Sequence, residues 1–407
     1  MSFLRYRVFI TPLLSDDTYD SAQDVSDYID ASGVPNVNRS IDAGDYDVGV
    51  YSYNDITIKG QNSNGIFNGP EDSRSIFPFG RDRAKVEVHF IEMDTSLGTE
   101  TSTTTFRGLI NEEATRIDPV SDSIRMRVLS RDSIIRNTKI QSGAIANGST
   151  STDAIKTILN TTRIRSVLTF NAANINPDFE YTIDDGSYFD NKKTQEALNE
   201  LLVTTNSVFV LDSSDNMIVK SRDETVASAL NLYGRYDLHG RENIIKISKY
   251  NSGWHRMFTS VKVGTQVSVN TALADQYGVR QKDVDFDFIT TNATKKSIAD
   301  RLLSEFQAPK IELECEIDTV TASAYDLLAP VSVNFPLRLQ PDAGNELPIV
   351  GITKIDEATE PLPNEYGSLE IDPSIAFKII GIQENVKAFT TTLKLRQVGM
   401  TLSDGVF

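Results

Sequence analysis

The chain has 407 residues, 39% of them hydrophobic, a length that predicts roughly two to four domains with cores of their own. Its 40 basic and 57 acidic residues give a formal net charge of −17, which argues against a protein that wraps DNA, because phosphate binding needs a net cationic surface. Cys315 is the single cysteine, so no intrachain disulfide is possible and a reducing compartment is expected.

The N-terminal segment does not have the pattern of a signal peptide, because Arg5, Arg7 and Pro12 interrupt its apolar run. No stretch of the sequence approaches the roughly 18 apolar residues of a membrane span. We therefore expect no membrane insertion by this chain.

Residues 1–142 predict a mostly antiparallel β domain, either a sandwich or a barrel. An opening strand is expected over 3–13, followed by a weak helical spacing over 23–32. The clearest strand covers 84–94, where apolar and polar residues alternate. Its inward side chains are expected to be Val86, Val88 and Phe90.

The stretch from Thr105 to Ile140, "TFRGLINEEATRIDPVSDSIRMRVLSRDSIIRNTKI", contains two more alternating segments with a turn at Asp118–Pro119. It holds no His or Cys. Its regularity is therefore typical of strands that form the wall of a β domain and carry no reactive groups. Arg125 and Arg127 share the outward face. The inward face is expected to hold Phe106, Ile110, Ile124, Met126 and Val128.

Residues 143–225 predict a small α+β domain. Ser151 can cap a helix that continues to about residue 162, and a strand is expected near 166–170. Two further strands are expected within 207–221. A second helix precedes them, and its inward residues are Ala197, Leu198, Leu201 and Leu202.

Residues 226–310 predict a β segment that leads into the strongest helix of the chain, 292–307, with Asn292 or Thr291 as its cap. Residues 311–407 contain strand after strand and predict a second β domain. The apolar stripe of the helix is formed by Ile298, Leu302 and Phe306.

The sequence lacks the short motifs of common enzyme chemistry. It has no G-x-x-x-x-G-K-[ST], G-x-G-x-x-G, H-E-x-x-H, C-x-x-C or G-x-S-x-G. The histidines His89, His239 and His255 are far apart, so a zinc site would need them to converge with carboxylates. No cofactor and no catalytic residue is expected.

Two groups of carboxylates are candidates for a site. Asp283, Asp285 and Asp287 alternate with apolar residues, which places them on one face of a predicted strand. They are either a solvated acidic face or a weak candidate for a divalent cation, since Ca²⁺ needs roughly six to eight oxygens. Asp184 and Asp185 precede a glycine and indicate a turn in preference to paired acid and base groups.

Basic residues also alternate on predicted strand faces. Arg81 and Arg83 precede Lys85 in this pattern, and Arg125 and Arg127 form a second pair. Such exposed basic faces are ordinary on proteins. The alternative is that these arginines meet acidic faces of a neighbouring subunit and set the register of an assembly.

The loop over 67–83 is unusually apolar. Phe67, Ile76, Phe77 and Phe79 would form an exposed apolar cluster if the loop were in solvent. We therefore expect this loop to make subunit contacts, with Phe77 and Phe79 as interface candidates.

The order of these elements resembles the baseplate hub, or tail-tip hub, proteins of tailed bacteriophages and related contractile injection systems. The resemblance is a pattern of elements that covers most of the chain, without one diagnostic motif. Its first part, "DITIKGQNSNGIFN" with "RDRAKVEVHF" and the stretch from Thr105, is similar to the first tube-like barrel of hubs. "GSTSTDAIKTILN" and "KTQEALNELLVTTNSVFVLDSSDNMIVKSRDE" are similar to their small α+β domain, and "AFKIIGIQENVKAFTTTLKLRQVG" to the closing strands of their second barrel.

The resemblance implies a β-rich α+β fold with two tube-like antiparallel β-barrel domains, a small α+β domain between them and a further β/helix segment. It implies a structural virion protein that is not an enzyme. It also implies a homotrimer whose six similar barrel edges match the tail tube on one side and a tail tip or spike on the other. Its partners would be further copies, tail tube and distal tail proteins, and tail-tip, spike or tail fibre proteins. Made in the host cytoplasm, it would reside at the phage tail tip or baseplate and continue the DNA channel for genome ejection. If part of the charge of −17 lines the lumen, DNA would pass without specific binding.

Two other functions stay open. A distal-tail or adaptor ring protein of the phage tail would be hexameric. A host-surface glycan-binding or cell-wall-degrading tail protein would use the aromatic residues near Tyr51, Tyr53 and Trp254, but a single tryptophan is poor for sugar stacking.

Overall fold

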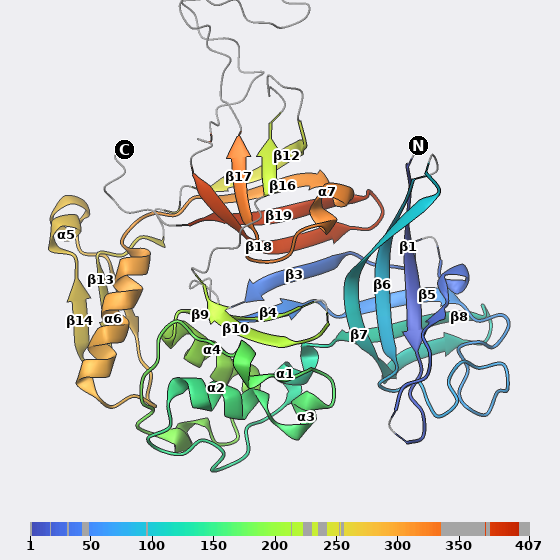
Figure 1. Cartoon of the computed structure of the whole chain (residues 1–407), viewed down its shortest axis with the longest axis horizontal. Helices are drawn as coiled ribbons and strands as arrows, with labels where there is room; N and C mark the ends of the chain where they lie inside the picture. Colours follow the sequence, from blue (N-terminus) through green and yellow to red (C-terminus); the bar gives the residue numbers. More distant parts are fainter. Residues whose placement is uncertain are drawn as a thin grey trace, which may run out of the picture.

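The computed structural model describes residues 2–398, apart from 17, 31, 43–48, 95–96, 213, 223–229, 235–241, 252, 254–255, 335–370 and 372–374. These residues form two large curled sheets, a three-stranded sheet and several helices (Figure 1). The fold is β-rich α+β with two half-barrel sheets, and the expected fold class is confirmed. Of the helices described, none is both long and apolar enough to cross a membrane.

The first sheet is antiparallel and has the strand order β2-β1-β6-β7-β8-β5. The segment 23–29 connects its two edges, because Asp24 pairs with β1 while Ile29 bridges to Gly60 of β5. This segment contains the short 3-10 helix η1 (Ser26–Tyr28), which is all the helix that the weak helical spacing over 23–32 corresponds to among the described residues. The strands are β1 (Ser2–Thr11), β2 (Gln23–Asp24), β5 (Ile56–Gln61), β6 (Lys85–Asp94), β7 (Thr99–Asp118) and β8 (Ser123–Ser130).

The core of the first sheet is formed by the residues expected from the alternation. A strand face that is half buried places every second side chain inside, and the side chains that the sequence assigned inward on β6, β7 and β8 are buried. The confirmed residues are Val86, Val88, Phe90, Phe106, Ile110, Ile124, Met126 and Val128.

The loop over 67–83 completes this core. Phe67 and Phe77 have no exposed surface, Ile76 is 9% exposed, and all three pack in the cluster of the first sheet. The loop therefore needs no subunit contact to remove these three side chains from water, and the expectation that it makes subunit contacts stays a prediction. Only Phe79, which is 53% exposed, remains available on the surface.

The second sheet has the order β10-β9-β4-β3-β18-β19-β16-β12, and β17 pairs with both β18 and β11. It is the larger of the two and lies above the helices in Figure 1. Its strands are β3 (Val37–Asp42), β4 (Gly49–Tyr53), β9 (Ser207–Leu211), β10 (Met217–Ser221), β11 (Leu230–Tyr233), β12 (Ile244–Asn251), β16 (Glu312–Asp318), β17 (Pro330–Asn334), β18 (Ala376–Asn385) and β19 (Thr390–Gln397).

Strands β3 and β4 come from the N-terminal part of the chain but occupy the middle of the second sheet. Strand β3 pairs antiparallel with β18, and β4 pairs parallel with β9. Residues 1–142 thus contribute strands to both large sheets. The division of the chain after residues 142, 225 and 310 stays a prediction.

Helices cover the end of the second sheet that contains β4 and β9 (Figure 1). Helix α2 is capped by Thr150, whose hydroxyl accepts from the amide of Asp153 at 3.1 Å, so the expected cap at Ser151 is off by one residue. No strand forms over 166–170, where only Thr169 makes an isolated bridge. The elements are α1 (Ser133–Asn137), α2 (Ser151–Leu159), α3 (Thr162–Arg165), η3 (Ala172–Asn174), η4 (Gly186–Phe189) and α4 (Thr194–Thr204).

A smaller unit, at the left of Figure 1, combines the three-stranded sheet β14-β13-β15 with helix α6. The helix expected over 292–307 is confirmed, with Ile298, Leu302 and Phe306 buried. Its elements are β13 (Ser260–Val263), β14 (Gln266–Val269), α5 (Thr271–Tyr277), β15 (Gln281–Val284) and α6 (Asn292–Phe306), and the short helix α7 (Thr319–Ser323) follows β16 in the second sheet.

The two large sheets meet at the turn between β18 and β19. Val386 in this turn is buried in the core of the first sheet. The ring of Phe389 stacks on Tyr6 with a centroid distance of 5.8 Å and lies 6.4 Å from Phe90. The turn of the second sheet is therefore a packing element of the first.

We predict that Phe77→Ala lowers the free energy of unfolding by about 3–5 kcal/mol, because it empties a fully buried site. Phe79→Ala in the same loop is the matched control and should change it by less than about 0.5 kcal/mol. Denaturant unfolding of the two variants measures both values. Equal, small effects would show that the loop is not part of the core.

Candidate functional site: the cleft between the two sheets

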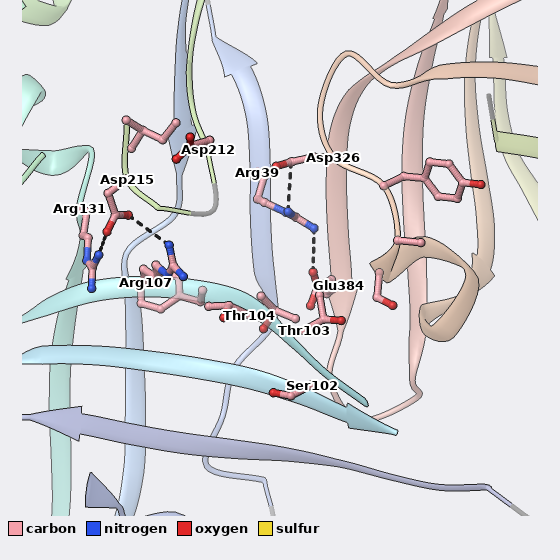
Figure 2. Close-up of a pocket in the computed structure, with 16 residues that line it drawn as sticks. Arg39, Ser102, Thr103, Thr104, Arg107, Arg131, Asp212, Asp215, Asp326 and Glu384 are labelled. Carbon is pink, nitrogen blue, oxygen red and sulfur yellow. Dashed lines mark hydrogen bonds and ion pairs between the residues drawn. The ribbon is translucent and has the colours of Figure 1, made fainter. Parts of the chain in front are cut away.

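A polar cleft of about 380 Å³ lies where the first sheet, the second sheet and the β9–β10 turn approach one another (Figure 2). Strand β7 forms one wall, and β3, β18 and the segment after α7 form the other. The lining residues are Arg39, Ser102, Thr103, Thr104, Thr105, Phe106, Arg107, Arg131, Leu211, Asp212, Asp215, Ser323, Ala324, Tyr325, Asp326 and Glu384.

The first group of charges in the cleft is centred on Arg39. Its guanidinium donates to Glu384 at 3.1 Å and to Asp326 at 3.2 Å (Figure 2). Arg39 is 8% exposed and Glu384 only 3%. Since β3 and β18 are adjacent strands, the pair joins two segments that are 345 positions apart in the sequence.

Burial dominates the ionisation of Glu384. Removal from water raises the pKa of this carboxyl to about 7, although the Arg39 guanidinium acts in the opposite direction. Oxygen Oε2 of Glu384 has no hydrogen-bond partner within the described part of the chain. A neutral carboxyl tolerates such a position better than a carboxylate does.

The second group of charges connects the first sheet to the β9–β10 turn. Glu87 lies 3.3 Å from both Arg107 and Arg131, and Asp215 forms ion pairs with the same two arginines. Asp215 is in the turn and has a φ of 59°, a conformation that aspartate adopts more readily than most residues. Arg131 is 6% exposed, so its charge depends on these partners.

His89 belongs to the edge of this second group. Its Nε2 lies 3.2 Å from Glu87, and its Nδ1 lies 2.9 Å from the hydroxyl of Ser102. The hydrogen bond with His89 and the guanidinium groups of Arg107 and Arg131 hold the pKa of Glu87 below its ordinary value, against the effect of burial. His239, His255 and Trp254 lie outside the described residues, as do the side chains of Tyr51 and Tyr53.

The charged side chains of the cleft are arranged to hold neighbouring elements in position and not to carry out a reaction. The residues that line the cleft include no His, Cys or Lys, and its arginines hold carboxylates from other elements. Each ion pair joins two elements that are distant in the sequence: β3 with β18 or the segment after α7, and β7 or the residue after β8 with the β9–β10 turn. The cleft therefore fixes how the elements around it are oriented.

The acidic candidates of the sequence are placed apart from this cleft. Asp283, Asp285 and Asp287 are all exposed, strand β15 ends at Val284, and Asp285 lies 3.3 Å from Lys295. Within the described ranges, no three His, Cys, Asp or Glu side chains gather closely enough to hold a metal ion. The arrangement agrees with a solvated acidic face.

Asp184 and Asp185 serve as local caps. The carboxylate of Asp184 accepts from the amides of Thr290 at 2.6 Å and Thr291 at 2.8 Å, at the start of α6. Asp185 accepts from the amide of Ser187 at 3.0 Å, at the start of η4. The two acids thus point to different elements.

The basic candidates differ from one another. Arg81 lies 3.0 Å from Glu112, and Arg127 lies 3.5 Å from Asp55. Arg83 is exposed, with a φ of 62°. Arg125 is exposed and forms no ion pair within the described residues. The interface role of these arginines and of Phe79 stays a prediction.

Comparison with known proteins shows similarity at the level of structure. No family model matches the chain, and no curated protein matches it. A tail protein from Neisseria meningitidis MC58 is similar with a TM-score of 0.53 and 12% identity, over 98% of each chain. The 43 kDa tail protein of prophage MuSo2 from Shewanella oneidensis has a TM-score of 0.49 and 10% identity, over 96% of this chain and 97% of its own. At these identities the likeness to the Neisseria protein shows a shared fold.

We predict that the stability of the protein decreases as the pH rises from about 4.5 to about 7. The folded-state pKa of Glu384, about 7, lies above the ordinary 4.5, so the folded state holds this proton more tightly. The stabilisation is fully present below the ordinary pKa and is lost as the pH rises to the folded-state pKa. The free energy of unfolding should fall by a total on the order of 3 kcal/mol over this range.

The variant Glu384→Gln tests this dependence, because its amide carries no titrating proton. Its melting temperature, measured by calorimetry at both pH values, should change less than that of the wild type. Glu314→Gln on β16 is the control and should keep the wild-type response, since Glu314 is only partly buried. A wild-type melting temperature that rises over this pH range would contradict the assignment.

Proposed function

We propose that this chain is a structural part of a phage tail, a hub that forms a homotrimeric ring between the tail tube and the tail tip or spike. The single observation that carries the proposal is the shared fold with a tail protein over 98% of both chains, which includes both half-barrel sheets. Two half-barrels in one chain allow three chains to present six similar edges. A trimer could then match a six-fold tube on one side and a three-fold tip on the other.

The cleft supports this role. The ion pairs of Arg107 and Arg131 with Asp215 join the first sheet to the β9–β10 turn of the second sheet and hold the two sheets in one orientation, as a ring subunit requires. A subunit that transmits load between neighbours needs this fixed geometry more than it needs a reactive group. We therefore propose a protein without catalytic activity.

The net charge of −17 per chain suits a channel through which DNA passes. Carboxylates on a lumen wall repel phosphates, so the DNA would move without specific binding. Other tail proteins would contact the two faces of the ring, in a virion at the end of the tail. An assembled ring whose channel wall is neutral or basic would contradict this part of the proposal.

We predict that the purified protein has about three times the 45.1 kDa mass of one chain. Light scattering coupled to size-exclusion chromatography, or native mass spectrometry, measures this mass. A hexamer would support the alternative of a distal-tail or adaptor ring protein. A stable monomer that hydrolyses peptidoglycan would contradict a purely structural role.

A further inference from the structure

Three cations form a continuous row on the outer face of the first sheet. In the register of the sheet, Lys59 of β5 lies opposite Arg125 of β8, and Arg125 lies opposite Arg116 of β7. All three side chains are exposed. We call Lys59, Arg125 and Arg116 the basic row. Like charges directly opposite one another on a sheet are destabilising, so the row costs stability in the isolated chain.

The basic row is not neutralised by ion pairs within the described residues. None of its members has a carboxylate within 4.0 Å there. Hydrogen bonds from Ser121 at 2.7 Å and from the amide of Val120 at 2.9 Å hold the pKa of Asp118 below its ordinary value, and the charge of Arg125 adds a smaller contribution in the same direction. The row therefore remains a local positive surface on a chain whose net charge is −17.

An acidic surface lies on the smaller unit. Asp283, Asp285 and Asp287 are exposed and alternate with residues that point inward, and we call them the acidic row. Strand β14 of the same unit exposes Val267 by 41% and Val269 by 51%. Lys262 of β13 lies between Asp283 and Val267 in register. Lys295 lies 3.3 Å from Asp285. The surface thus combines carboxylates, two lysines and apolar area that a contact could bury.

The two rows are at opposite ends of the molecule. In Figure 1 the longest axis is horizontal, with the first sheet at the right end and β13–β15 at the left end. A contact between unlike ends of identical chains is heterologous, and it generates a closed ring when the rotation between copies closes. Complementary charges at the two ends would set the direction and register of that contact.

We propose that the basic row of one copy docks on the acidic row of the next copy, as the head-to-tail contact of the ring. This inference rests on the proposed ring-forming function. A second copy is the occupant that these surfaces favour, because its acidic row and the exposed Val267 and Val269 supply carboxylates and apolar area at the end of the molecule opposite the basic row (Figure 1).

The first test reverses two charges of the basic row. Lys59→Glu with Arg125→Glu should raise the dissociation constant of the assembly by about tenfold or more at low salt, because like charges would then face one another. Sedimentation velocity over a range of protein concentrations measures this constant. Arg163→Glu with Arg165→Glu is the matched control, since both residues are exposed on α3 and the change in net charge is identical.

The second test restores complementarity. A chain with Lys59→Glu, Arg125→Glu, Asp283→Lys and Asp287→Lys has two of the three charges reversed in each row, so the reversed residues again face opposite charges. It should recover most of the wild-type assembly, and the chain with only Asp283→Lys and Asp287→Lys should not. Should the charge reversals prevent folding, as judged by circular dichroism, Lys59→Gln with Arg125→Gln gives a milder version with the same direction of effect.

The results separate this inference from the proposed function. A wild-type ring that is unaffected by reversal of either row would overturn the contact and leave the ring intact. A wild-type monomer at all concentrations would overturn both. If reversal of the basic row abolished binding of a fluorescent DNA duplex without a change in assembly, the row would be a nucleic-acid surface and the proposed contact would be wrong.

Discussion

The pairing of β3 with β18 is the constraint on which the rest of the structure depends. It joins residues near the start of the chain to residues near its end, in the middle of the larger sheet. On one side of this pair β4 carries β9 and β10 with their helices, and on the other side β19 carries β16 and β12. Closing so long a loop costs chain entropy before any contact is gained, so the second sheet is completed only when distant parts of the chain have met.

The buried charges at this junction act on geometry more than on stability. A buried ion pair contributes little net free energy, because the loss of hydration offsets the attraction between the partners. A buried ion pair destabilises every alternative packing of the strands in which one charged partner is buried without the other. Arg39 with Glu384, and Arg131 with Asp215, thus select one relative orientation of strands and turns, which apolar contacts alone would specify less sharply.

Charge is distributed unevenly over this acidic protein. Most of the arginines discussed above form ion pairs with carboxylates of the same chain, so their positive charges are compensated locally. The row of Lys59, Arg125 and Arg116 differs because nothing in the described parts of its own chain compensates it through an ion pair. Solvent screens such a surface within about 10 Å, so it acts on what comes into contact with it rather than at long range.

The sequence by itself determined the local elements of this protein and the faces that they bury. The alternation in β6 and β8 and the 3.6-residue period in α4 and α6 identified their core residues, because both patterns repeat within a few positions. Only the tertiary structure decided that β3 and β4 join the second sheet, that Phe77 closes a core, that Arg39 meets Glu384, and that three cations align across three strands. These facts depend on the pairing and register of segments far apart in the chain, and a local period contains no information about which strand will become the neighbour.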